Sequence, residues 1–84
     1  MALTAVEVLD DANAKAIRDR SEAERRLTDA VRSAQRSLDT VMNPAEFDAR
    51  GFASAAVAVL ESEAAWKAAA ARCAELRDLR IKLA

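Results

Sequence analysis

Asn43-Pro44-Ala45-Glu46 stands near the middle of the 84-residue chain and decides how the chain folds. Pro44 is the only proline and Gly51 is the only glycine. Proline fits the first position of a helix, where its missing N–H has no partner to lose, and asparagine is a good N-cap. The residue before a proline is pushed out of helical geometry. This stretch therefore predicts the end of one helix and the start of another.

The N-terminal arm predicts one long helix over about 5–42. Thr4-Ala5-Val6-Glu7 has the pattern of a capping box, in which the threonine hydroxyl and the glutamate carboxylate satisfy each other's backbone N–H groups. Apolar residues then recur every 11 residues, a period that predicts a nearly straight helix. One such series is Ala5, Ala16, Leu27 and Leu38.

The C-terminal arm predicts a second long helix over about 52–83, after a turn at about 43–51. Residues 44–50 allow two interpretations: a separate helical turn, with Asp48 as the cap of the long helix, or a continuous extension of that helix. Two arms of nearly equal length predict an all-α fold. It is a single domain over 1–84, an antiparallel, coiled-coil-like hairpin that self-association or a partner completes into a bundle.

The charges at the free ends favour the antiparallel arrangement. Acidic residues open the first helix, and basic residues close the second, so a hairpin brings opposite charges together. These residues are Glu7, Asp10 and Asp11 on one side and Arg77, Arg80 and Lys82 on the other.

The composition argues against several classes of function. There is no histidine or tyrosine and a single glycine, so the usual general base, the commonest metal ligand and a phosphate-binding loop are all missing. We expect no enzyme activity, no cofactor and no metal site. The N-terminus lacks a basic signal-peptide region, and the longest uncharged run, residues 51–60, is too short for a membrane span. We expect a cytoplasmic protein or one within an assembled particle, and the excess of arginine over lysine is typical of high-GC bacteria and their phages.

The second arm carries more apolar surface than the first can cover. Within residues 52–60 only Ser54 is polar, whereas the opposing residues 32–40 are mostly polar. A helix that is apolar on all sides is normally surrounded on all sides. The predicted protein interface comprises Phe47, Phe52, Ala56, Val57, Val59, Leu60 and Trp66. In an alternative interpretation Phe47 and Phe52 fold back over the excess, and Trp66 fills the core.

Three hypotheses about function remain. The first is a non-enzymatic protein–protein interaction or assembly module that forms a homo-oligomer, with a dimer favoured. The second is a small phage- or bacterium-encoded inhibitor, adaptor or particle component that binds a different protein. The third is nucleic-acid binding through Arg25, Arg26, Arg32 and Arg36. A net charge of −1, with acidic residues on the same side of the helix, does not favour the third hypothesis.

Overall fold

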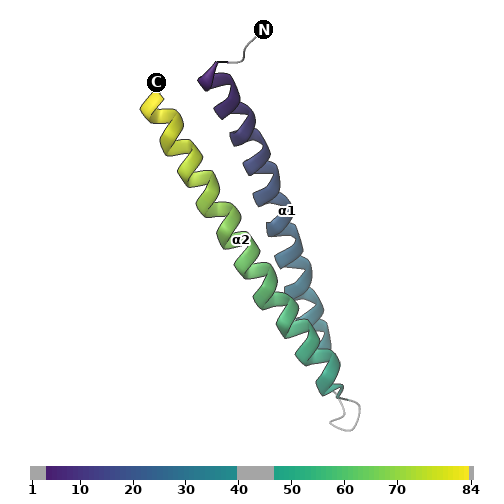
Figure 1. Cartoon of the computed structure of the whole chain (residues 1–84). Coiled ribbons are helices and arrows are strands. Elements are labelled where there is room, and N and C mark those ends of the chain that lie inside the picture. The colour runs from purple at the N-terminus through teal and green to yellow at the C-terminus, as the bar shows by residue number, and fades with distance from the viewer. Residues whose placement is uncertain (1–3, 40–46, 84) are drawn as a thin grey trace.

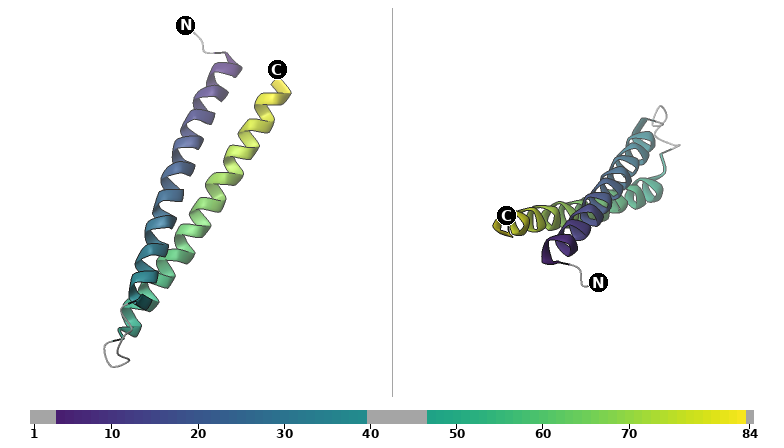
Figure 2. Two further views of the ribbon diagram at one scale, coloured as in Figure 1. Left: turned by 180° about the vertical axis from the view of Figure 1, so that it is seen from behind. Right: turned by 90° about the horizontal axis from the view of Figure 1, so that it is seen from above.

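A computed structural model describes residues 4–39 and 47–83 and shows two helices, α1 (Ala5–Asp39) and α2 (Ala49–Leu83). They run antiparallel and side by side, and they cross when viewed from the end (Figures 1 and 2). The described residues contain no strand, so the predicted all-α hairpin is confirmed. The hairpin measures 65 × 22 × 15 Å. Over the same residues, neither helix has an apolar stretch long enough to cross a membrane.

The start of α1 is the predicted one. The backbone N–H of Glu7 donates a hydrogen bond to the Thr4 hydroxyl oxygen at 3.2 Å, which is one half of the capping box. The described part of α1 ends at Asp39, and the predicted end near residue 42 lies outside the described residues, as does the Asn43-Pro44 stretch.

The start of α2 follows one of the two predicted alternatives. The helix begins at Ala49, three residues before the predicted start at Phe52, and Asp48 is its N-cap. The Asp48 carboxylate accepts a hydrogen bond from the backbone N–H of Gly51 at 3.1 Å. A side chain on Gly51 would collide with this carboxylate, so the glycine leaves room for the cap.

Replacing Asp48 with alanine is expected to lower the stability of the hairpin by about 1 kcal/mol, because the first turn of α2 loses its side-chain acceptor. Thermal unfolding followed by circular dichroism should show a melting temperature lower by about 4–8 °C. Asp48→Asn is the matched control, since asparagine caps helices as well as aspartate does. Equal losses in both variants would contradict the capping role.

Most residues with reduced exposure follow a seven-residue repeat in both helices. In α1 one row of them is spaced alternately three and four residues apart, except where Arg20 is exposed: Val6, Leu9, Asn13, Ala16, Ala23, Leu27, Ala30, Ala34 and Ser37. In α2 one row keeps the same spacing without a break: Phe52, Ala55, Val59, Ser62, Trp66, Ala69, Cys73, Leu76 and Arg80. Seven other residues with reduced exposure lie beside these rows: Ala12, Val31, Gly51, Ala56, Glu63, Ala70 and Ala74. We call these two rows the seam. This spacing is that of a left-handed coiled coil.

The 11-residue series predicted for α1 also agrees with most of this exposure pattern. Ala16 and Leu27 of the series named above have reduced exposure, as do Ala12, Ala23 and Ala34 of a second series at the same spacing, and only the end members Ala5 and Leu38 are exposed. Two helices that stay in contact over many turns must keep their contact rows facing each other, which selects a repeat of seven.

The seam is thin. Only Ala16, Cys73 and Leu76 are buried among the described residues, and they form one cluster with Leu9 and Ala12 packed against it. The register that faces Ala16 with Cys73 also places Ala23 across from Trp66 and Ala30 across from Val59. At these two levels a small residue of α1 opposes a larger one of α2, whereas the same register places Leu27 across from Ser62. At the free ends Arg80 donates a 2.9 Å hydrogen bond to the Asp10 carboxylate, which is the type of contact expected from the charges there.

Candidate association surface

Three of the predicted interface residues lie in the seam. Phe52, Val59 and Trp66 are spaced seven residues apart along α2, and each is partly buried against α1. The structure therefore places them in the contact between the two helices. They hold the hairpin together as well as reaching its surface.

Phe47 and Phe52 form a pair at the turn end of the hairpin. Their ring centroids are 6.0 Å apart and their planes are tilted by 48°. The contact between the two rings agrees in part with the alternative interpretation, in which both phenylalanines fold back over the excess apolar surface. They do not cover it, because Val57 remains 52% exposed and Leu60 remains 66% exposed.

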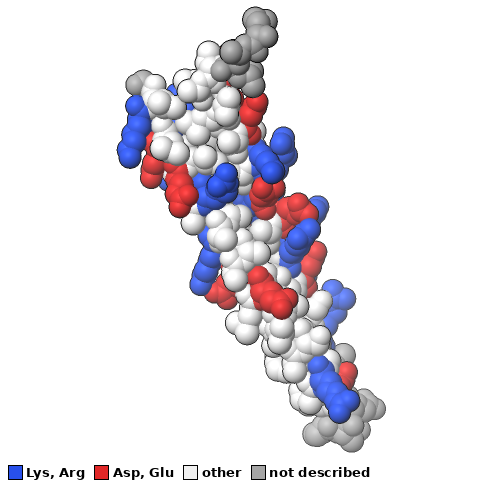
Figure 3. All heavy atoms as spheres, in the orientation of Figure 1, with Lys and Arg blue, Asp and Glu red and all other residues white. Residues whose placement is uncertain are grey.

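An open apolar groove of about 410 Å³ lies between α1 and α2 near the turn. Both helices line it with Val31, Ala34, Gln35, Leu38, Phe52, Ala56, Val59 and Leu60. Four of the predicted interface residues thus meet in one groove. In Figure 3 the part of the hairpin next to the turn end is mostly white, a second white area lies near the free ends, and acidic and basic side chains alternate between the two. We call this groove the turn-end groove.

Val57 lies apart from the groove. Its position in the repeat is two residues before Val59, on the side of α2 turned away from α1, and it lines none of the grooves along the hairpin that are described here. The sequence grouped Val57 with Leu60, and the two are neighbours on the surface of α2, but only Leu60 lines the groove.

The free ends carry apolar surface to which the sequence assigned no interface residue. On the flank of the seam that bears the turn-end groove lies a second groove of about 420 Å³, which apolar, neutral polar and basic residues line together: Asn13, Ile17, Arg20, Ala70, Cys73, Ala74, Arg77, Arg80 and Ile81. On the opposite flank a third groove, also about 420 Å³, lies among Ala5, Val8, Leu9, Ala12, Leu79, Lys82 and Leu83. In the sequence this apolar surface corresponds to the alternating Leu79-Arg80-Ile81-Lys82-Leu83. Because charged residues alternate with the apolar ones there, the stretch does not stand out as apolar.

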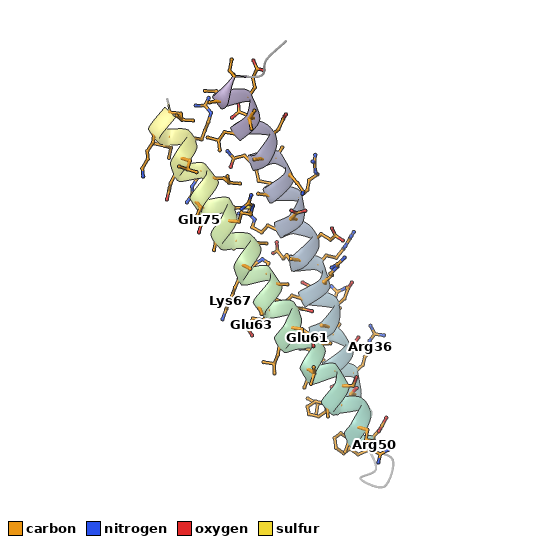
Figure 4. All side chains as sticks on the ribbon, viewed as in Figure 1. Arg36, Arg50, Glu61, Glu63, Lys67 and Glu75 are labelled. Carbon is orange, nitrogen blue, oxygen red and sulfur yellow. The ribbon has the colours of Figure 1, made fainter. Side chains whose placement is uncertain are left out.

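The predicted nucleic-acid residues form part of a mixed-charge surface on α1. The Arg26 guanidinium pairs with the Glu22 carboxylate at 2.7 Å. Arg25 and Arg32 are exposed and lie seven residues apart on the outer side of the helix. Arg36 lies near the turn end, and its side chain extends away from α2 in Figure 4. The four arginines therefore do not converge on one site, and one of them is already paired with an acid.

Within 4–39 and 47–83, no three His, Cys, Asp or Glu side chains come together in a way that could hold a metal ion. The grooves offer apolar side chains and exposed charges along two straight helices. No protein-family model matches the chain, and no curated protein or solved structure shows a significant match to it.

Proposed function

We propose that this chain is a non-enzymatic assembly module that associates with copies of itself, in the cytoplasm or within an assembled particle. The observation that carries the proposal is the set of large apolar side chains that the hairpin leaves uncovered. Each is at least 39% exposed: Val8, Ile17, Leu38, Phe47, Val57, Leu60, Leu79, Ile81 and Leu83. Single exposed apolar residues are ordinary, but contiguous apolar patches are typical of association surfaces. Four of these residues, Ile17, Leu38, Leu60 and Ile81, line the two grooves on one flank of the seam.

The area of the hairpin supports the same proposal. Its accessible surface is 6542 Å², whereas a compact monomer of 9.1 kDa exposes about 4,900 Å². Its radius of gyration is 19.0 Å, compared with about 12 Å for a compact domain of this length. The excess surface is about the total area that a standard protein–protein interface buries, 1,200–2,000 Å².

The small number of buried residues in the seam also supports the proposed self-association. Three buried residues, two of them no larger than cysteine, give a small gain from burial, and several seam positions hold polar side chains. Domains with so little core usually gain stability from a disulfide, a metal or association. The chain has one cysteine, so association is the available route.

The test is the solution mass of the full chain, measured by sedimentation equilibrium from low to high micromolar concentration with helicity followed by circular dichroism. We expect a dimer that dissociates on dilution and loses helix as it does so. A stable, fully helical monomer throughout this range would contradict the proposal and would favour binding to a different protein.

A further inference from the structure

A second row of residues runs along α2 beside the seam, on the flank that bears the turn-end groove. Its members are spaced alternately four and three residues apart: Ala49, Ala53, Ala56, Leu60, Glu63, Lys67, Ala70, Ala74, Arg77 and Ile81. We call it the flank row. It contains Leu60 and Ile81, both 66% exposed, which are the most exposed large apolar side chains in the described parts of the chain.

The centre of the flank row is a pair of opposite charges. Glu63 and Lys67 form a 2.6 Å ion pair one helical turn apart, with side chains 43% and 66% exposed. In Figure 4 they lie next to one another along one edge of α2. Because their exposure leaves both groups accessible, each can also face a charge on another molecule.

The flank row is symmetric about the level of residue 65. Leu60 and Ala70 lie five residues on either side of that level, Ala56 and Ala74 lie nine residues away, and Ala49 and Ile81 lie sixteen residues away. A helix with such a row can pack against an antiparallel copy of itself with every member facing another member. Large residues then face alanine, which lets the two helices approach closely.

We propose that a second copy of this chain packs antiparallel along the flank row, about a two-fold axis at the level of residue 65. This inference rests on the proposed function and specifies its interface. Glu63 of each copy faces Lys67 of the other, so the two ion pairs of the separate hairpins become a ring of four alternating charges. A two-fold interface must be complementary to itself, and this row is.

Charge complementarity selects this register. A shift of one heptad in one direction would place Glu63 against Leu60 of the second copy, and a shift in the other would place it against Ala74. Both shifts remove the charge pairing and bury a carboxylate against an apolar side chain, which is unfavourable. Positions that carry opposite charges in this way set partner orientation in coiled coils.

Helix α1 contributes to the same interface. The seam register sets Glu24 of α1 at the level of the axis, with Ile17 and Val31 seven residues on either side of it. The two-fold axis therefore brings Ile17 of one copy towards Val31 of the other. It also brings the two copies of Glu24 to the same level, and these like charges can separate because the side chain is exposed and can extend into water. The turn-end groove of each copy then receives Ala70 and Ala74 of the other, while Ile81 faces Ala49 beyond the groove. Such an interface needs about 800 Å² per partner, about an eighth of the hairpin's surface.

The test uses two charge-reversed variants of the full chain, Glu63→Lys and Lys67→Glu. Each alone places like charges at both central contacts, so its homodimer should dissociate at a concentration about tenfold higher or more. Mixed in equal amounts, the two variants should form a heterodimer in preference to either homodimer, because opposite charges then face each other at both central contacts, although each chain keeps like charges one turn apart. The matched controls are Glu22→Lys and Arg26→Glu, which reverse an equivalent ion pair on α1 and should leave dimerisation unchanged.

Cross-linking gives a second measurement that does not depend on the strength of the charge contacts. In a Cys73→Ala background, Ala56→Cys combined with Ala74→Cys should yield disulfide-linked dimers, because these positions face each other across the axis. Ala65→Cys is the control: it lies level with the axis on the opposite side of α2, and it should not cross-link.

The outcomes separate this inference from the proposed function. A heterodimer preference together with cross-linking through residues 56 and 74 supports the flank-row dimer. A dimeric unaltered chain whose charge variants show no such preference, or which cross-links through residue 65, overturns the flank row and leaves self-association intact. An unaltered chain that stays monomeric overturns both.

Discussion

Replacing Leu76 with alanine is expected to lower the free energy of unfolding by about 2–3 kcal/mol, at the lower end of the range for a leucine in a core. Leu76 is 8% exposed and is the largest of the three buried residues that hold the helices together near the free ends. A chain of this length has a total stability of about 4–13 kcal/mol, so the loss is a large share of it. Urea unfolding followed by circular dichroism measures it directly.

Leu79→Ala is the matched control for this prediction. The same side chain is removed from the same turn of α2, but from a position that is 49% exposed. Its expected cost is below about 1 kcal/mol, since less apolar surface is returned to water. If the two variants were equally destabilised, the seam would not be the main source of stability.

Replacing Leu60 with glutamate is expected to raise the dimer dissociation constant by about a hundredfold or more. Loss of a buried leucine costs about 1.5–3 kcal/mol, and in a two-fold dimer each substitution occurs twice. The added carboxylates would also be drawn out of water against alanine. Sedimentation equilibrium over a range of concentrations gives the constant, and circular dichroism of the same samples shows whether the helices persist.

Leu79→Glu is the control for Leu60→Glu. Leu79 is also an exposed leucine of α2, 49% exposed, but it lies on the opposite flank of the seam, where it borders the third groove. Its substitution should change the dissociation constant by less than about twofold, as expected for a surface change outside the interface. An equal weakening by both variants would show that the opposite flank takes part in association as well.

The hairpin itself follows from local signals in the sequence. A capping box at Thr4, two long stretches free of proline and glycine, and opposite charges at the free ends all indicate the same arrangement, and consistent local signals are a good guide to a fold. The start of α2 was less certain, because Gly51 can either interrupt a helix or make room for a cap. The hydrogen bond from the Gly51 backbone N–H to the Asp48 carboxylate sets the start of α2 at Ala49, and this contact is visible only in the structure.

The packing could not be predicted in the same way, because 22 of the residues are alanine. Alanine is tolerated at contact and solvent positions alike, so the apolar pattern fits a period of 11 as well as one of seven. The period of the contact rows determines which side of α2 faces α1. When the period is not known, residues 52–60 form a single apolar stretch. Once it is known, Phe52 and Val59 belong to the seam, Leu60 to the flank row and Val57 to the outer side of α2.

The position of Cys73 allows its thiol to report when the two helices of the hairpin separate. The only thiol in the chain lies in the most tightly packed layer, across from Ala16, and is 9% exposed. A thiol reagent can reach it freely only when the two helices separate, so the rate of labelling gives the frequency of that separation without any added probe. Dependence of that rate on protein concentration would show how strongly association keeps the helices closed.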